Sequence, residues 1–538
     1  LFQYQFIMKH ISRRRFIEDS FNTAFSAGIA ATLASGKLTQ HVVAQNQVAA
    51  NDQLGVAIIG AGGRAGVHGD VFGSDKRIKI LYVCDPDINR AKGLSNRIEK
   101  KFGYAPEAIS DFRNILDKKS IDIVTCASSN HWHALIAIWA LQAGKHCYIE
   151  KPLSYNIHEG KSIVAAAKKY GLVFQTGTQC RSATNVRDAV EFIRNGGIGE
   201  VKLARVLAYH QRGAIGAYGE YPVPNGIDYD LWCGPAPVEP ITRKRFHYDW
   251  HWQRRFGNGD IGNQGVHQVD TALRLINVDR FPQSVITYGG RLGYDIEMKD
   301  EKYRDAGDTA NTQVSIYDYG NKSLIVEIHG LKISSPLGIP AGENPGTRIG
   351  AIAYGTNGYV VQGRLLSLKE NFWWCFSQTF AFDLKGNLIK EFKNCDSKGN
   401  VIVNNDPVGG HVTNFIDAVL ANDPKKVTAD ARCGALSAAI CHLGNISYYL
   451  GENNKISNNN LKQALQSVKS LDDNETTLAR TVEHLNENGV DLNKTPLSLG
   501  TNLNIDVDKE VFIDNNDANA MMTRDYRPNF VVPEPKDV

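Results

Sequence analysis

Short apolar runs alternate with amphipathic segments of helical length between residues 50 and 180. The runs predicted as strands are Val56–Ile59, Ile78–Cys84, Ile121–Ala127, His146–Ile149 and Leu172–Thr176. The segments predicted as helices between them are Asn89–Phe102, His131–Ala143 and Ile157–Tyr170. Strands and helices that alternate at this spacing are typical of a parallel, doubly wound α/β sheet, which binds its ligand at the carboxyl ends of the strands.

The pattern becomes strand-rich after about Glu200. The predicted strands are Val201–Ala208, Ser284–Tyr288, Thr312–Tyr317, Ser323–Ile328 and Gly358–Val361, followed by a hairpin over Thr379–Phe392. Helices return at His411–Ala421 and Thr428–Leu450. This order indicates a C-terminal α/β domain with an open, mainly antiparallel sheet. The polar, Asn-rich segment after Asn453 predicts a wrapping extension with little core.

The chain therefore divides into four predicted parts. Residues 1–50 hold upstream residues, a leader and a linker, 51–177 a Rossmann domain, 178–452 a substrate and oligomerisation domain, and 453–538 the C-terminal extension. A length of 538 residues exceeds what one hydrophobic core usually supports, as this division requires.

Composition narrows the class of protein. Hydrophobic residues make up 42% and charged residues 22% of the chain, as in ordinary globular proteins. The formal net charge is only +3 and the basic residues form no stripe along the chain, which argues against a nucleic-acid partner. No apolar run is long enough to span a membrane. Nine cysteines without a C-x-x-C pair argue against both a disulfide framework and a zinc site, so no metal is expected.

The first residues resemble an export signal. Ser12–Ile17 reads SRRRFI, which is similar to the twin-arginine (Tat) motif, and a mildly apolar run follows from Phe21 to Gly36. A V-x-A site at Val42–Ala44 fits signal cleavage. We therefore expect the Tat export machinery as a partner and a periplasmic or otherwise exported product. The alternative is a disordered basic tail.

A glycine-rich turn follows the first predicted strand. Gly60-Ala61-Gly62-Gly63-Arg64-Ala65 fits G-x-G-x-x-G/A at the start of a helix, where backbone N–H groups can hold a pyrophosphate. Asp85 closes the next strand at the distance where a carboxylate binds the ribose 2′-hydroxyl. We interpret the segment as a dinucleotide site. Asp85 and Asp87 favour NAD over NADP, although Arg64 and Arg90 leave NADP as the less favoured choice. The alternative is a glycine-rich turn in an ordinary α/β domain.

Further motifs resemble one family. Glu150-Lys151-Pro152 stands at a strand end, and with Ser129–Ala134, Gly177–Arg181 and Asn263–Asp270 it resembles the Gfo/Idh/MocA oxidoreductases over residues 54–451. The resemblance implies a Rossmann domain and an α/β sheet domain with nicotinamide and substrate, often a sugar, in the cleft between them. The cofactor contacts it implies are Gly60, Gly62, Gly63, Arg64, Asp85, Asn130, His133, Glu150, Lys151 and Gln179.

Four residues are candidates for catalysis. Lys151, held at a strand end by a proline, suits proton transfer because partial burial lowers the pKa of a lysine. His267 and Asp270 stand at i and i+3 of a predicted helix, so the carboxylate could orient the imidazole. Asn263 occupies a position where many relatives carry aspartate, and an amide cannot stabilise an imidazolium as a carboxylate does.

An aromatic and basic cluster suggests where a sugar binds. Tryptophan and tyrosine faces suit the C–H faces of sugars, and arginine binds hydroxyls or carboxylates. The candidate substrate contacts are Arg181, Tyr209, Trp232, Trp250, Trp252 and His267. A packed subdomain core or an oligomer surface explains the cluster equally well.

The combined hypothesis is an exported, homo-oligomeric oxidoreductase that moves hydride between a tightly bound NAD and a carbinol of a sugar or polyol. The C-terminal extension or residues 44–53 are expected to cover the cleft. One alternative is a redox-neutral, NAD-dependent glycosidase or lyase that acts through a keto-sugar. The other is a non-catalytic protein that binds a nucleotide or a glycan.

Overall fold

The computed structural model describes residues 53–333, 347–365, 379–395 and 407–538. The twin-arginine motif, the V-x-A site and residues 44–52 lie outside these ranges. Among the described residues, no helix has the length and apolar character needed to cross a bilayer.

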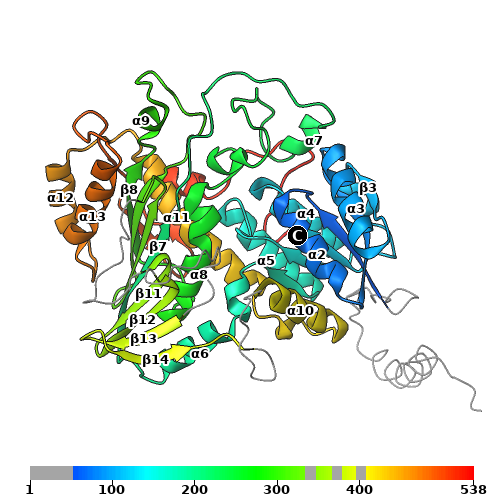
Figure 1. Cartoon of the computed structure of the whole chain (residues 1–538), viewed down its shortest axis with the longest axis horizontal. Coiled ribbons are helices and arrows are strands. Elements are labelled where there is room, and N and C mark those ends of the chain that lie inside the picture. Colours follow the sequence, from blue (N-terminus) through cyan, green and yellow to red (C-terminus); the bar gives the residue numbers. More distant parts are fainter. Residues whose placement is uncertain (1–52, 334–346, 366–378, 396–406) are drawn as a thin grey trace, which may run out of the picture. The chain divides into compact units, whose positions relative to one another are not determined.

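The first sheet is the predicted parallel one (Figure 1). Its strands are β1 (Leu54–Ile59), β2 (Ile78–Cys84), β3 (Glu107–Ile109), β4 (Ile123–Cys126), β5 (His146–Ile149) and β6 (Phe174–Thr176). They lie in the order β3-β2-β1-β4-β5-β6, and every neighbouring pair is parallel. This is the strand order of a Rossmann domain, with its crevice beside β1 where the order reverses.

Helices cover both faces of this sheet because its strands are apolar on both sides. One face packs on α2 (Gly63–Ser74), α3 (Ile88–Phe102) and α10 (Pro407–Leu420). The other packs on α4 (His133–Gln142) and α5 (Ile157–Tyr170). Val412, Phe415 and Ile416 of α10 join the core of the Rossmann sheet, although α10 follows most strands of the second sheet in sequence. The two domains are therefore interlocked by the chain path.

The second sheet is mixed and mainly antiparallel. Its strands are β7 (Val201–Tyr209), β8 (Ser284–Gly290), β9 (Thr312–Asp318), β10 (Ser323–His329), β11 (Thr347–Gly355), β12 (Gly358–Leu365), β13 (Thr379–Asp383), β14 (Leu388–Phe392), β15 (Ser498–Leu499), β16 (Leu503–Asp506) and β17 (Val511–Phe512). Among the described strands of this second sheet, only β7 and β10 pair in parallel. One face packs on α6 (Thr184–Arg194), α8 (Val266–Leu275) and α11 (Ala431–Leu450). The α/β class and both sheet types are thus confirmed.

Short helices lie in the connections between the larger elements. They are α7 (Tyr229–Cys233), α9 (Tyr294–Met298) and α14 (Asn516–Ala520).

The C-terminal extension carries more core than the sequence suggested. In α12 (Asn458–Gln466) and α13 (Asn474–Glu487), leucines at helical spacing pack on the outer face of the second sheet. These buried leucines are Leu461, Leu465, Leu478 and Leu485. The expectation of little core was wrong because a few apolar residues that share one helix face make a buried stripe even in a polar segment.

Candidate active site

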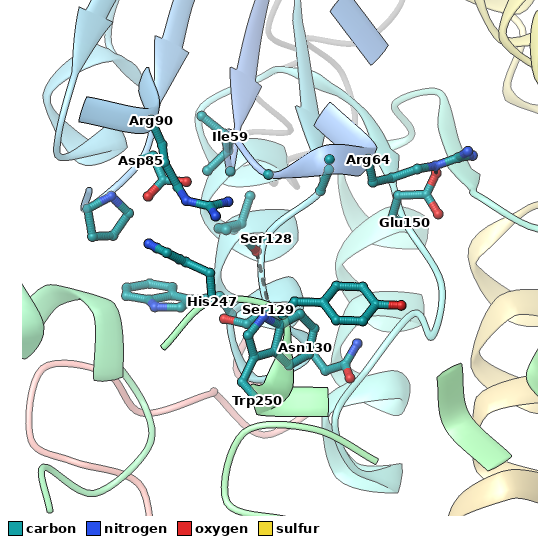
Figure 2. A pocket seen from close by; sticks show the side chains of 18 of the residues that line it. Ile59, Arg64, Asp85, Arg90, Ser128, Ser129, Asn130, Glu150, His247 and Trp250 are labelled. Carbon is teal, nitrogen blue, oxygen red and sulfur yellow. Dashed lines mark hydrogen bonds and ion pairs between the residues drawn. The ribbon is translucent and has the colours of Figure 1, made fainter. Parts of the chain in front are cut away.

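A cavity of about 580 Å³ lies at the carboxyl ends of the Rossmann strands and is lined by residues of both domains. Figure 2 shows Asp85 and Arg90 at one end, Arg64 and Glu150 at the other, and Ser128–Asn130 between them. The sequence-predicted residues that line it are Gly60, Gly62, Gly63, Arg64, Asp85, Asn130, Glu150, Lys151, Gln179, Trp232, Trp250, Asn263 and His267. The fold therefore gathers most of the predicted cofactor residues and three of the four catalytic candidates into one space.

The glycine turn has the shape that a pyrophosphate needs. Gly60 has a φ of 84°, and a Cβ there would lie 2.6 Å from the backbone nitrogen of Ser128. At Gly63 a Cβ would meet nothing within 4 Å, so the first turn of α2 is open toward the cavity. The N-cap residue of α2 is Gly62, so no capping side chain occupies the start of this helix. The N–H groups at this helix start are thus placed to bind phosphate oxygens, and the residues present fit a dinucleotide.

Asp85 organises the end of the cavity next to β2. Its carboxylate accepts the backbone N–H of Ala61 at 2.7 Å and that of Asp87 at 2.8 Å, which ties the glycine turn to the loop after β2. Burial raises the pKa of this carboxyl, and the two backbone hydrogen bonds oppose that rise. Asp87 in turn accepts a hydrogen bond from Nε2 of His247 at 2.9 Å. His247 of the second domain therefore binds the acidic loop that is expected to hydrogen-bond the ribose.

Glu150 is the hub at the other end. Its carboxylate accepts from Nε of Arg64 at 2.6 Å, and from His68 and Gln179 at 3.2 Å each. Burial alone would favour the neutral acid, but the charge of Arg64 and the hydrogen bond from His68 hold the pKa of Glu150 well below its usual range. Glu150 also accepts the backbone N–H of Lys151 at 3.2 Å, so it fixes the start of the Lys151-Pro152 turn.

The amine of Lys151 is held by a neutral partner. Its Nζ donates to the backbone oxygen of Asn263 at 2.7 Å and to the side-chain Oδ1 of the same residue at 3.1 Å. Burial lowers the pKa of Lys151 to about 8, and the nearby charges of Arg64 and Arg212 add to the effect while Glu150 opposes it. The neutral amine needed for a proton acceptor is thus accessible near neutral pH.

Asn263 and His267 come from an irregular helix start. Residues Ile261–Gly265 form a π-helical turn that runs into α8, a distortion that is frequent at functional sites. It brings both side chains into the cavity, one turn apart. Burial and the neighbouring Lys151 lower the pKa of His267 well below its usual value, so its imidazole is neutral at physiological pH.

Asp270 lies behind the cavity instead of in it. Its fully buried carboxylate accepts from Nε of Arg181 at 2.9 Å and from the Ser437 hydroxyl at 2.7 Å. This pairing also explains why Arg181, a predicted substrate contact, does not line the cavity. Asp270 positions Arg181 and α11. The role of Asp270 in catalysis and that of Arg181 in substrate binding stay predictions.

Three further predicted residues are also buried outside the cavity lining. His133 contacts the carbonyl oxygens of Pro152 and Ser128, at 2.7 Å and 3.1 Å, and so supports two loops that do line it. Tyr209 donates to Glu327 at 2.8 Å in the core of the second domain. Trp252 is 4% exposed, and its ring lies against Arg212. The alternative of a packed core describes Tyr209 and Trp252 best.

Aromatic rings of the second domain line the same cavity as Lys151. The rings of Trp250 and His251 stack with centroids 3.7 Å apart, and Tyr248 adjoins them with an unusual φ of 67°. The carbonyl of Tyr248 contacts Nδ1 of His251, which fixes that ring. Strain of this kind persists where surrounding contacts enforce it and is common at functional sites.

The sequence reasoning missed several of these residues. His68 stands four residues after Arg64, so the shared helix face that carries both to Glu150 was readable from spacing. His247 carried no such signal, since Asp87, its partner, is 160 residues away in sequence. The partners of His251 are its neighbours Tyr248 and Trp250, but the spacing of these residues does not show that they line the cavity.

Two family models match the chain. Residues 54–178 match the Gfo/Idh/MocA model described as "Oxidoreductase family, NAD-binding Rossmann fold". Residues 213–290 match the model described as "Oxidoreductase family, C-terminal alpha/beta domain". These matches confirm the resemblance seen at Glu150-Lys151-Pro152: residues 54–178 are similar to the NAD-binding Rossmann domain of the Gfo/Idh/MocA oxidoreductases, and residues 213–290 are similar to their C-terminal domain.

Known relatives extend the comparison. The chain is 28% identical over 199 residues to levoglucosan dehydrogenase from Pseudarthrobacter phenanthrenivorans, which covers 37% of this chain and 42% of that protein. It is 29% identical over 224 residues to D-glucoside 3-dehydrogenase from Escherichia coli, which covers 41% and 54%. The chain thus spans about half the length of these curated relatives. A solved structure of levoglucosan dehydrogenase with NADH and levoglucosan has a TM-score of 0.51 at 18% identity, covers 73% of this chain and 96% of that one, and shares the fold.

Proposed function

We propose that this protein is an NAD-dependent oxidoreductase of the Gfo/Idh/MocA family that acts on a CH–OH group of a carbohydrate. The observation that carries the proposal is the amine of Lys151, held by Asn263 in the same cavity as the open glycine turn. A proton acceptor and a dinucleotide site that share one cavity are the two parts that oxidation of an alcohol requires.

The chain's own residues supply the proton chemistry. When bound, NAD⁺ supplies the acceptor for the hydride that leaves the carbinol carbon. Neutral Lys151 takes the hydroxyl proton, and with a pKa of about 8 roughly a tenth of the lysines are neutral at pH 7. His267 stays neutral, so it orients the hydroxyl through a hydrogen bond and does not act as a cationic acid. Ionised Glu150 keeps Arg64 and the Lys151 backbone in place.

The proposed substrate class is a sugar or polyol. The stacked rings of Trp250 and His251 offer an apolar face for sugar C–H groups beside Lys151. Two relatives named as sugar dehydrogenases support the same class.

We further propose export by the Tat route, tight retention of NAD, and homo-oligomerisation. The motif at Ser12–Ile17 supports export of an already folded protein. Free NAD is scarce outside the cytoplasm, so an exported enzyme has to carry its own. A single sugar substrate then reduces the bound NAD once, and continued turnover needs a second carbonyl substrate, with ping-pong kinetics.

Mass spectrometry of the purified full chain tests the cofactor, and a panel of sugars and glycosides monitored at the nicotinamide absorbance tests the reaction. We expect about one NAD per chain after dialysis and an absorbance rise with a sugar alcohol that Lys151→Met slows by about 10²–10⁴-fold. Lys168→Met, at an exposed lysine of α5, is the matched control. Cleavage of a glycoside without net reduction would instead establish the redox-neutral glycosidase. A preparation that emerges empty and steadily reduces added NAD would refute tight retention.

A further inference from the structure

One wall of the dinucleotide cavity is built from two separate elements. Trp132, on the turn before α4, and Leu231 and Trp232, on α7, all line the cavity. The indole N–H of Trp132 is shared between the carbonyl oxygens of Leu231, at 3.2 Å, and Trp232, at 3.0 Å. The N–H of Asp228, which precedes α7, donates to the carbonyl of Pro86 at 3.0 Å, beside Asp85. The wall therefore stands at the Asp85 end of the cavity.

The segment Met521–Val538 packs behind this wall. The ring of Phe530, which is 6% exposed, meets the Trp132 ring edge-to-face with centroids 5.6 Å apart. Arg527 donates from Nη1 to the carbonyl oxygens of Asp230, at 2.9 Å, and Gly234, at 3.1 Å. Asp230 lies in the first turn of α7 and Gly234 follows its last residue, so Arg527 binds both ends of this short helix.

The same segment is anchored on the far side to α5. The backbone N–H of His158 donates to the carbonyl of Met522 at 2.9 Å, and the hydroxyl of Ser162 donates to that of Pro533 at 2.7 Å. Val532, at 3% exposed, joins the core between the Rossmann sheet and α5. The segment is thus a strap from α5 to α7, and none of its residues lines the cavity. This corrects the expectation that the extension covers the cleft directly.

We propose that Arg527 and Phe530 are positioning residues for the dinucleotide site, because they hold α7 against Trp132 and thereby slow the release of NAD. This inference rests on the proposed function. A dinucleotide enclosed by the wall leaves when α7 and Trp132 separate. That separation has to break either the contact of Phe530 with Trp132 or the hydrogen bonds of Arg527 to α7. A purely structural strap would instead stabilise the fold without changing the lifetime of bound NAD.

The test measures NAD dissociation from the full chain. Protein loaded with radiolabelled NAD is chased with excess unlabelled NAD, and the variants compared are Phe530→Ala, Phe530→Leu and Arg527→Ala. We expect dissociation to quicken by about tenfold or more in Phe530→Ala and by several-fold in Arg527→Ala, because such changes act mainly on the off-rate. Phe530→Leu keeps an apolar contact with Trp132 and should largely restore retention. Val531→Ala, at a neighbour that is 57% exposed, should release NAD at the wild-type rate.

Hydrogen exchange of α7 gives a readout that does not depend on activity. Backbone amides of Trp232–Gly234 should exchange faster in Arg527→Ala and Phe530→Ala. If both variants release NAD at the wild-type rate and the amides of α7 exchange at the wild-type rate, the positioning role of Arg527 and Phe530 is refuted and the proposed function is unaffected. A wild-type protein that binds no NAD would overturn both. Where Phe530→Ala fails to fold, Arg527→Ala decides, since it removes only partly exposed contacts.

Discussion

The substitution Asn263→Asp places a carboxylate directly against the proposed catalytic amine. Oδ1 of Asn263 lies 3.1 Å from Nζ of Lys151, and the backbone oxygen of the same residue remains at 2.7 Å. The change keeps the side-chain size and the acceptor and adds one negative charge. It therefore isolates the effect of charge on the Lys151 pKa.

The size of the effect follows from the distance. Two unit charges about 3.1 Å apart attract by roughly 5 kcal/mol at an effective dielectric constant of about 20. Desolvation of the new carboxylate reduces this figure, and close opposite charges usually move a pKa by about 1–3 units. The pKa of Lys151 should rise from about 8 to roughly 9–11.

The assay is the pH dependence of kcat/KM for sugar oxidation. The limb that reports deprotonation of Lys151 should move from about pH 8 upward by about 1–3 units, and the rate at pH 7 should fall about 10- to 1000-fold. Reduction of the keto product at pH 7 should change little, because Lys151 is already protonated there. Asn504→Asp, at an exposed residue of β16, controls for added charge. An oxidation profile that stays in place would remove Lys151 from its role as the base.

Three further outcomes are expected. Asp85→Ala should weaken NAD binding by about 1.5–3 kcal/mol and reduce the discrimination against NADP in binding titrations. The reason is that the change removes a charged acceptor and the hydrogen bond that holds the glycine turn at Ala61. A wild-type protein that already prefers NADP would contradict this. Lys151→Met should lower turnover by about 10²–10⁴-fold with NAD still bound. The same variant should also raise Tm by a few degrees below pH 8. The pKa of Lys151 is about 8 in the folded protein and 10.5 in the unfolded chain, so the buried ammonium lowers the free energy of unfolding by up to about 3 kcal/mol below pH 8 and by nothing above pH 10.5. An unchanged Tm would contradict the lowered pKa. Replacing Arg13 and Arg14 together by lysine should leave an unprocessed cytoplasmic precursor in cell fractionation, whereas normal delivery would exclude the Tat route.

Local features of the fold and the site were predictable from sequence because their causes are local. Alternating apolar runs and amphipathic segments determine the strands and helices of the Rossmann sheet, and the spacing of Gly60, Gly62 and Asp85 determines the dinucleotide turn. Lys151 was identifiable because a strand end and a proline fix it within a few residues.

Partners brought together from distant parts of the chain were decided by the tertiary structure alone. Spacing placed His267 and Asp270 on one helix, but packing against Arg181, 89 residues away in sequence, turned the carboxylate to a structural pair. Likewise the closure of His247 on Asp87 spans 160 residues, and the strap at Phe530 reaches Trp132 across most of the chain. Periodicity specifies which face of an element is buried. It does not specify which other element covers that face. That choice depends on how two surfaces from distant parts of the chain pack together, and such packing produces no repeating pattern in the sequence of either one.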